Sequence, residues 1–205
     1  MLKINIAVLV SGSGTNLQAL IDASKAGTLK NGEIKTVISS KETAYALQRA
    51  KDNGIKAYCV PKRDFPDQQA FERRLIEILK SEGAELIVLA GFTIILSPYF
   101  INEYRDRIIN IHPSLIPAFC GEGFYGLKVH QAALERGVKV TGATVHFVNE
   151  IPDGGKIILQ RAVNVKDNDT PEILQRRVMM KAEWRILPKA CEMVCKQLLK
   201  EKKAK

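Results

Sequence analysis

Two polar side chains that could act together in catalysis stand two residues apart in an apolar stretch. The segment Ile-Ile-Asn-Ile-His at residues 108–112 is typical of a buried strand, and Pro113 ends it because proline has no N–H for a strand ladder. Residues two apart on a strand share a face, so Asn110 and His112 would place an amide donor beside a titratable imidazole. Open α/β sheets bind ligands at the C-terminal ends of their strands. The same spacing is equally consistent with a structural role, in which His112 is a hydrogen-bonded histidine at the end of a strand.

The most informative carboxylate is Asp153, which precedes Gly154 and Gly155 in a predicted loop. An aspartate in a turn commonly bonds its own backbone, so a purely structural role stays open. If Asp153 approaches His112, the two form a general acid–base pair, because a carboxylate stabilises the imidazolium and raises its pKa. Asn110 could then donate a hydrogen bond to an oxyanion. No side chain is an evident nucleophile, which favours direct transfer between two bound substrates.

A glycine-rich turn, Ser-Gly-Ser-Gly-Thr-Asn at residues 11–16, connects the apolar run Ile4–Val10 to a helical pattern. Glycine lets the backbone approach a ligand, and a helix N-terminus offers free N–H groups to an anion. Leu17 stands where a dinucleotide-binding fingerprint needs its third glycine, and the lysine of a Walker loop is missing. The turn therefore suits a single phosphate better than NAD or ATP. A tight turn without a ligand is the alternative.

Metal and serine chemistry are less well supported. The histidines His112, His130 and His146 match no local zinc-ligand spacing, and we expect no metal. The nucleophile elbow Gly-x-Ser-x-Gly is absent. The four cysteines form no C-x-x-C pair, which favours a reducing cytoplasm without structural disulfides.

Apolar runs alternate with helical patterns through the first half of the chain, which predicts an α/β protein with a doubly wound, mostly parallel, Rossmann-like sheet. The expected strands are residues 4–10, 34–39, 57–60, 85–90 and 108–112, and the expected helices follow residue 16, span residues 43–53 and 67–81, and begin at Pro98.

The pattern changes after residue 117. Residues 117–126 are rich in glycine and aromatic residues, which predicts a mobile surface loop beside the site. A helix at 127–136 and an antiparallel pair of strands at 142–148 and 156–163 follow. Thr170 and Pro171 then open a long C-terminal helix, with a break expected at Pro188. No repeat or linker interrupts the chain, so we expect one domain over residues 1–205.

The composition indicates a globular protein. Hydrophobic residues make up 46% of the 205 residues, and no stretch approaches the roughly 20 apolar residues that span a bilayer. No secretory signal is recognisable, so we expect a cytoplasmic protein that binds no membrane. Part of the net charge of +9 lies in residues 196–205, and no aromatic residues are interleaved with a basic stripe. We therefore expect small anionic substrates rather than nucleic acid. The oligomeric state does not follow from the residues, and a homodimer stays open.

Five segments, in order, closely resemble those of the phosphoribosylglycinamide formyltransferases, the folate-dependent glycinamide ribonucleotide transformylases of purine synthesis. Two of them, the histidine and Asp-Gly-Gly segments, are shared with the wider formyltransferase family. The likeness extends from Ile4 to about Pro188. The segments are Ser-Gly-Ser-Gly-Thr-Asn (11–16), Leu-Ala-Gly-Phe (89–92), Asn-Ile-His-Pro-Ser-Leu (110–115), Thr-Gly-Ala-Thr-Val-His-Phe-Val (141–148) and Asp-Gly-Gly (153–155).

The resemblance implies the formyltransferase fold and transfer of a formyl group from the co-substrate 10-formyltetrahydrofolate to the amine of 5-phosphoribosylglycinamide, in de novo purine biosynthesis. It implies that Asn110 binds the formyl oxygen, that His112 transfers the proton, and that Asp153 orients and charges His112. The N-terminal half would bind the ribonucleotide phosphate, and the C-terminal half would complete the folate site. The implied ribonucleotide residues are Gly12, Ser13, Gly14, Thr15, Asn16 and Glu183, and the implied folate residues are Phe92, Thr93, Ile94, Ile95, Leu96, Asn110, Val148, Asp153 and Gln68.

The chain departs from the family pattern at four places. Thr93-Ile94 replaces Met-Arg, and Gln68 replaces a basic residue for which Arg63 or Arg73 is the candidate substitute. Glu183-Trp184 replaces a Glu-His pair, and the loop 119–127 is longer than in some relatives.

The rival interpretations are methionyl-tRNA formyltransferase and formyltetrahydrofolate hydrolase. Each carries a further domain, for which 205 residues leave no room beside this core. A non-catalytic nucleotide- or folate-binding module is the rival from another class, although binding alone needs no proton shuttle.

Overall fold

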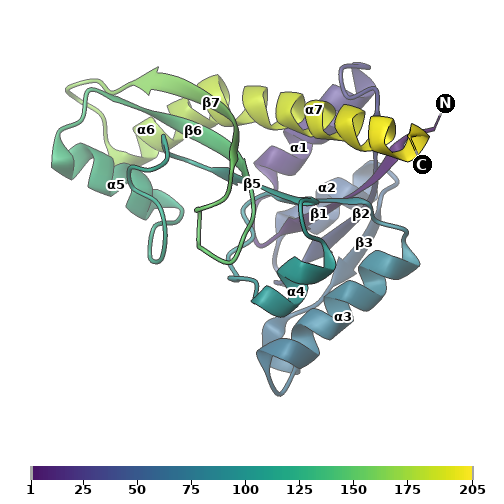
Figure 1. The fold of residues 1–205 in the computed structure, drawn as a ribbon. Coiled ribbons are helices and arrows are strands. Elements are labelled where there is room, and N and C mark those ends of the chain that lie inside the picture. Colours follow the sequence, from purple (N-terminus) through teal and green to yellow (C-terminus); the bar gives the residue numbers. More distant parts are fainter. Residues whose placement is uncertain (1, 205) are drawn as a thin grey trace.

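The computed structural model describes residues 2–204, which form one sheet with helices on both faces (Figure 1). Its strands are β1 (Ile4–Val10), β2 (Gly32–Ser39), β3 (Lys56–Cys59), β4 (Leu86–Leu89), β5 (Ile108–His112), β6 (Val140–Phe147) and β7 (Ile157–Asn164). The strand order is β3-β2-β1-β4-β5-β6-β7. The strands from β3 to β5 pair in parallel, whereas β6 pairs antiparallel with both β5 and β7. The expected fold class is thus confirmed, including the C-terminal antiparallel addition.

Helices cover the sheet because its central strands are apolar on both sides. The helices are α1 (Thr15–Lys25), α2 (Tyr45–Asp52), α3 (Gln68–Ser81), α4 (Pro98–Glu103), α5 (Leu127–Arg136), α6 (Pro171–Val178) and α7 (Trp184–Lys203). Alternate residues of β1 point to opposite faces: Ile6 and Val8 pack with α1 and α7, while Ala7 and Leu9 pack with α3 and α4. Figure 1 shows α7 on one side of the sheet and α3 and α4 on the other.

Most element boundaries lie within two residues of those predicted, but the C-terminal helix is irregular at a different place. We expected a break at Pro188, which instead lies inside α7. The irregularity is a π-helical segment, Met179–Glu183, between α6 and α7. Pro188 removes the hydrogen bond to the carbonyl of Trp184 and its ring crowds that group. Since Trp184 directly follows the widened turn, the distortion falls before the proline and the helix continues.

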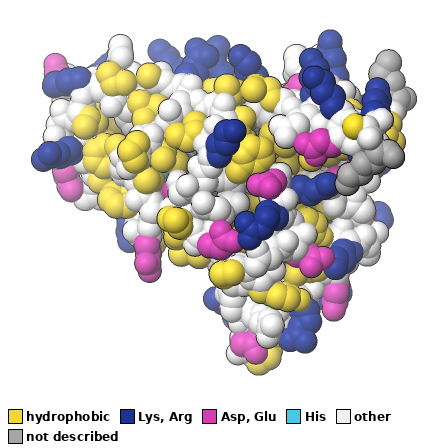
Figure 2. Space-filling model, in the orientation of Figure 1, with side chains coloured by type: hydrophobic (Ala, Val, Ile, Leu, Met, Phe, Trp, Pro, Cys, Tyr) yellow, Lys and Arg dark blue, Asp and Glu magenta, His cyan; other side chains and the backbone are white. Residues whose placement is uncertain are grey.

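The sheet places the predicted chemistry at one edge. β5 ends at His112, and its antiparallel neighbour β6 sets His146 opposite Asn110 and Thr144 opposite His112. In Figure 2, several lysine and arginine side chains lie along the upper edge, where α7 runs, and others are scattered over the face shown. Within the described part of the chain, no helix combines the length and the apolar character needed to cross a membrane.

Candidate active site

A cleft of about 760 Å³ opens at the C-terminal ends of β1, β4 and β5. Its lining includes the turn at 12–16, the stretch at 89–96, the end of β5, the loop at 121–126, the loop at 148–153, and side chains of α5, β6 and the helical segment that carries Glu183. Every site residue expected from the sequence lines this cleft except Gln68. The segments come from both halves of the chain, which meet here because β5 stands between parallel β4 and antiparallel β6.

Asn110, His112 and Asp153 lie together. As predicted, the two β5 side chains share a face, and both approach the carboxylate of Asp153. Nδ1 of His112 lies 3.4 Å from Oδ2 of Asp153, and Nδ2 of Asn110 lies 3.4 Å from Oδ1. His112 is 4% exposed, so its imidazole is shielded from water. The arrangement can hold a charged imidazole beside an amide donor, which are the parts of an acid–base site with an oxyanion contact.

His146 is a member of this cluster that we did not expect from the sequence. Its Nδ1 lies 2.8 Å from the carbonyl oxygen of Phe147, to which it donates. In the neutral ring Nε2 then accepts from Nδ2 of Asn110 at 3.1 Å, and it also lies 3.4 Å from Oδ1 of Asp153. His146 therefore fixes which way the Asn110 amide points. The signal that could have revealed it is the position directly opposite Asn110 on β6, which becomes visible only once the register is known.

Burial and charge act in opposite directions on the two titratable groups. Burial raises the pKa of Asp153, but the His146 and His112 imidazoles and the Gly121 N–H outweigh it, so the pKa is lowered overall. Burial lowers the pKa of His112, and the charge of Asp153 opposes that shift. Asp153 therefore stays ionised at neutral pH, and it stabilises a proton on His112 that the buried site would otherwise reject.

The loop predicted at 117–126 does lie beside the site, and its backbone contacts both catalytic candidates. The N–H of Gly121 donates to Oδ2 of Asp153 at 2.9 Å. The carbonyl oxygen of Phe119 accepts from Nε2 of His112 at 2.8 Å. Both ring nitrogens of His112 are thus engaged, and Nε2 becomes available only when the Phe119 carbonyl moves away.

The loop that carries Asp153 is shaped by its glycines. Asp153 adopts a left-handed backbone conformation with φ of 56°, which is rare for a residue other than glycine. A Cβ placed on Gly155 would lie 1.8 Å from the carbonyl oxygen of Phe147, at the end of β6. The absence of a side chain at Gly155 lets the loop fold back onto β6, which brings Asp153 to His112.

We expect the substitution Gly155→Ala to destabilise the fold by more than about 2 kcal/mol, because backbone must shift to remove the contact. Urea unfolding would measure the loss. Gly12→Ala is the matched control, since a Cβ there meets nothing within 4 Å. Equal stability of the two variants would contradict this account of the loop.

The glycine turn before α1 leaves its N–H groups available. Gly14 adopts a left-handed conformation with φ of 72°, and no side chain caps the helix. A Cβ on Gly14 would lie 2.7 Å from that of Ala46, so the turn packs tightly on α2. Asn16 donates to the carboxylate of Glu183 at 2.6 Å. Burial raises the pKa of Glu183 to about 7, against the opposing effect of that hydrogen bond.

Gln68 occupies a different place from the one expected. It lies outside the lining of the cleft, where its amide donates to Glu72 at 2.6 Å and to the carbonyl of Ile95 at 3.2 Å. Buried Glu72 also accepts from the N–H of Ser97 at 2.7 Å. Gln68 therefore holds the segment at 92–97 that lines the cleft, rather than entering the cleft itself. Arg63 pairs with Glu42, and neither it nor Arg73 lines the cleft.

His130 of α5 also lines the cleft, and burial lowers its pKa to about 4. It is therefore neutral at physiological pH. Among residues 2–204, no group of three or more histidine, cysteine, aspartate or glutamate side chains is placed to hold a metal ion.

Comparison with known proteins identifies the family. The family model described as formyl transferase matches residues 4–191. The chain belongs to the formyl transferase family. This formyl transferase is 42% identical over 174 residues to the phosphoribosylglycinamide formyltransferase of Escherichia coli (strain K12), covering 85% of the present chain and 79% of that protein. The structure of the present chain is similar to that of glycinamide ribonucleotide transformylase 1 from Symbiobacterium toebii, with a TM-score of 0.89 and 42% identity. The similarity covers 95% of the present chain and 89% of the other.

Longer relatives contain the same region as one part. The formyl transferase chain is 43% identical over 192 residues to the trifunctional purine biosynthetic protein adenosine-3 of Gallus gallus, covering 94% of this chain but only 18% of that protein. It spans 66% of the chloroplastic phosphoribosylglycinamide formyltransferase of Arabidopsis thaliana, at 36% identity.

Proposed function

We propose that this formyl transferase moves the formyl group of 10-formyltetrahydrofolate to the amine of 5-phosphoribosylglycinamide in purine biosynthesis. The observation that carries the proposal is that one cleft contains Asn110, His112 and Asp153 together with the uncapped turn at 12–16. The first group suits acyl transfer, and the second suits a phosphate. The names of the relatives supply the acceptor and the formyl group, and the folate donor is the one that the family resemblance implies.

In this reaction a bond forms between the amine nitrogen and the formyl carbon, and the bond from that carbon to the folate nitrogen breaks. One proton leaves the amine, and one is added to the folate nitrogen. We assign the developing oxyanion to Nδ2 of Asn110. One hydrogen of that amide is directed to His146, and the long 3.4 Å contact to Asp153 leaves the other available for the formyl oxygen.

We assign proton transfer to Nε2 of His112, because Nδ1 faces Asp153. The carbonyl of Phe119 occupies the position next to Nε2 and would be replaced by the substrates when they bind. Asp153 acts through its charge, since its low pKa keeps it ionised while the imidazolium forms.

The remaining cleft residues divide between the two substrates. We assign the ribonucleotide phosphate to the N–H groups of the turn at 12–16 and the ribose hydroxyls to Glu183, which is already joined to Asn16. The folate would lie against the segment at 92–96 and against Val148, which both line the cleft. Gln68 supports that segment from behind.

The affinity for phosphoribosylglycinamide is expected to rise about tenfold between pH 6 and pH 8, because a carboxyl with a pKa of about 7 ionises over that range. Hydroxyl groups donate best to the ionised form, so the raised pKa weakens binding at the lower pH. Calorimetric titration at several pH values would measure the affinity. The variant Glu183→Gln serves as the control, because ionisation of the ligand phosphate affects the affinity of both proteins equally. Parallel profiles for both proteins would remove Glu183 from the site.

The test of the function is an assay of the purified chain with 10-formyltetrahydrofolate, with and without phosphoribosylglycinamide. Turnover of folate that depends on the ribonucleotide supports the transferase. Turnover without it would mean that water is the acceptor and that the chain is a hydrolase. Binding of both ligands without turnover would point to a binding module.

A further inference from the structure

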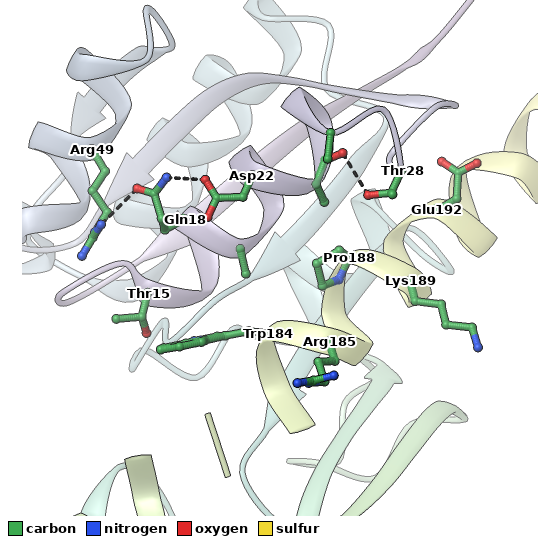
Figure 3. A pocket seen from close by; sticks show the side chains of 13 residues that line it. Thr15, Gln18, Asp22, Thr28, Arg49, Trp184, Arg185, Pro188, Lys189 and Glu192 are labelled. Atoms are coloured by element: carbon green, nitrogen blue, oxygen red, sulfur yellow. Dashed lines mark hydrogen bonds between the residues drawn. The ribbon is translucent and has the colours of Figure 1, made fainter. Parts of the chain in front are cut away.

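A second cavity, of about 750 Å³, lies between α1 and α7 (Figure 3). We call it the α1–α7 groove. One stripe of α1, including Gln18 and Ala19, forms one side, and one stripe of α7, including Trp184 and Pro188, forms the other. Its only lining residue in common with the active-site cleft is Thr15. The groove therefore adjoins the phosphate turn at Thr15 and otherwise lies outside the site already described.

The acidic side chains of the α1–α7 groove already have partners. The carboxylate of Glu192 accepts from the backbone N–H of Asn31 at 2.9 Å and from its side-chain amide at 2.5 Å. Asp22 accepts from the amide of Gln18 at 2.8 Å, a contact drawn in Figure 3. Their negative charges are therefore partly offset by hydrogen bonds that a ligand would not need to break.

The basic side chains of α7 retain most of their capacity to bind. Only Nε of Arg185 is engaged, at 3.3 Å from the carbonyl of Met180, which leaves the terminal nitrogens of its guanidinium free among the described residues. Lys189 makes no hydrogen bond or ion pair within residues 2–204. The two residues are four apart on α7, so they lie one turn apart on the same side of the helix. Together they present two cationic groups at the rim of the groove.

Trp184 gives the groove a flat aromatic wall. Figure 3 shows its indole edge-on, with Arg185 beside it and Pro188 one turn further along α7. Ala19 and Ala23 of α1 also line the groove, and their small side chains leave room for a planar group. Aromatic faces and guanidinium groups both stack on flat rings. The hydroxyl of Thr15 provides a polar atom for the edge of such a ring.

We propose that the α1–α7 groove is a second ligand site, which binds a small anion composed of a flat heteroaromatic ring and a phosphate group, as in a nucleoside monophosphate. The ring lies against Trp184, and the phosphate contacts Arg185 and Lys189. A bare phosphate would lose the stacking, and an uncharged nucleoside would lose both cationic contacts. The groove therefore discriminates against each half of the ligand alone.

The test uses the intrinsic fluorescence of the full-length chain, in which Trp184 is the single tryptophan. AMP, adenosine and inorganic phosphate are titrated separately. AMP is expected to change the emission saturably, with an affinity at least about tenfold higher than that of either part, as expected for losing one charge-assisted or stacking contact. The double variant Arg185→Ala, Lys189→Ala should bind AMP at least about tenfold more weakly. Lys196→Ala, Lys200→Ala removes the same charge from exposed positions of α7 and should bind like the unsubstituted chain.

Several outcomes would overturn the proposal. They are an emission that AMP does not change saturably, equal affinity in the two double variants, and competitive displacement of AMP by phosphoribosylglycinamide, which would place AMP in the cleft. Sedimentation that shows a dimer dissociated by the Arg185, Lys189 variant would instead identify a second copy of the chain as the occupant. None of these readouts depends on turnover, so the proposed enzymatic function stands or fails separately.

Discussion

Replacing His112 by alanine is expected to lower kcat for formyl transfer by about 10²–10⁴-fold, the range typical of losing a general acid–base group. His112 is the titratable side chain at the end of β5 that faces an ionised carboxylate within the cleft. Its removal takes away the group to which we assign proton transfer between the two substrate nitrogens. Single-turnover rates at saturating concentrations of both substrates would measure the effect.

The control for His112→Ala is the dissociation constant of phosphoribosylglycinamide, which should change by less than about threefold because the phosphate turn and Glu183 are untouched. Added imidazole, which fits the space left by the side chain, should restore part of the rate. A variant with normal turnover would show that His112 carries no proton and would leave only the binding part of the function.

Asp153→Asn is expected to lower kcat by about 10²-fold or more while changing ribonucleotide affinity little, because the residue acts on His112 rather than on substrate. The substitution removes the negative charge that opposes the effect of burial on His112, so the pKa of His112 should fall further below its ordinary value. It also places an amide donor where Oδ1 or Oδ2 now accepts from Asn110 and Gly121.

Two measurements separate this role of Asp153 from direct contact with substrate. NMR titration of the His112 ring should show the lowered pKa in the free variant, and the pH profile of kcat should shift in the same direction. Lost ribonucleotide binding with turnover intact would instead identify Asp153 as a contact residue.

The sequence allowed the fold class and the pairing of Asn110 with His112 to be predicted, because both follow from short-range periodicity. Alternating strand and helix patterns have few solutions other than a doubly wound sheet. Whether Asp153 contacts His112 could not be decided from the residue pattern. Its distance to His112 depends on how β6 and β7 pair with β5, and a register is a long-range property that local pattern does not set.

His146 shows the same limit. Its chemistry was evident from its type, but its position opposite Asn110 required the antiparallel register. Gln68 was assigned to the folate from an aligned position, which does not reveal that a neighbouring buried carboxylate, Glu72, accepts a hydrogen bond from its amide. The π-helical turn had no local signal at all, whereas Pro188, which did carry one, left the helix intact.

The π-helical turn allows residues 171–203 to contact both the active-site cleft and the hydrophobic core. Each residue of an α-helix advances the chain by about 100° around the axis, and a π-turn accommodates one extra residue without that rotation. Met179–Glu183 therefore sets the phase between α6 and α7. Glu183 points to Asn16 while Leu187 and Cys191 still face the core. A chain one residue shorter here could keep α7 packed on the sheet, or could keep Glu183 in contact with Asn16 of the glycine turn, but not both.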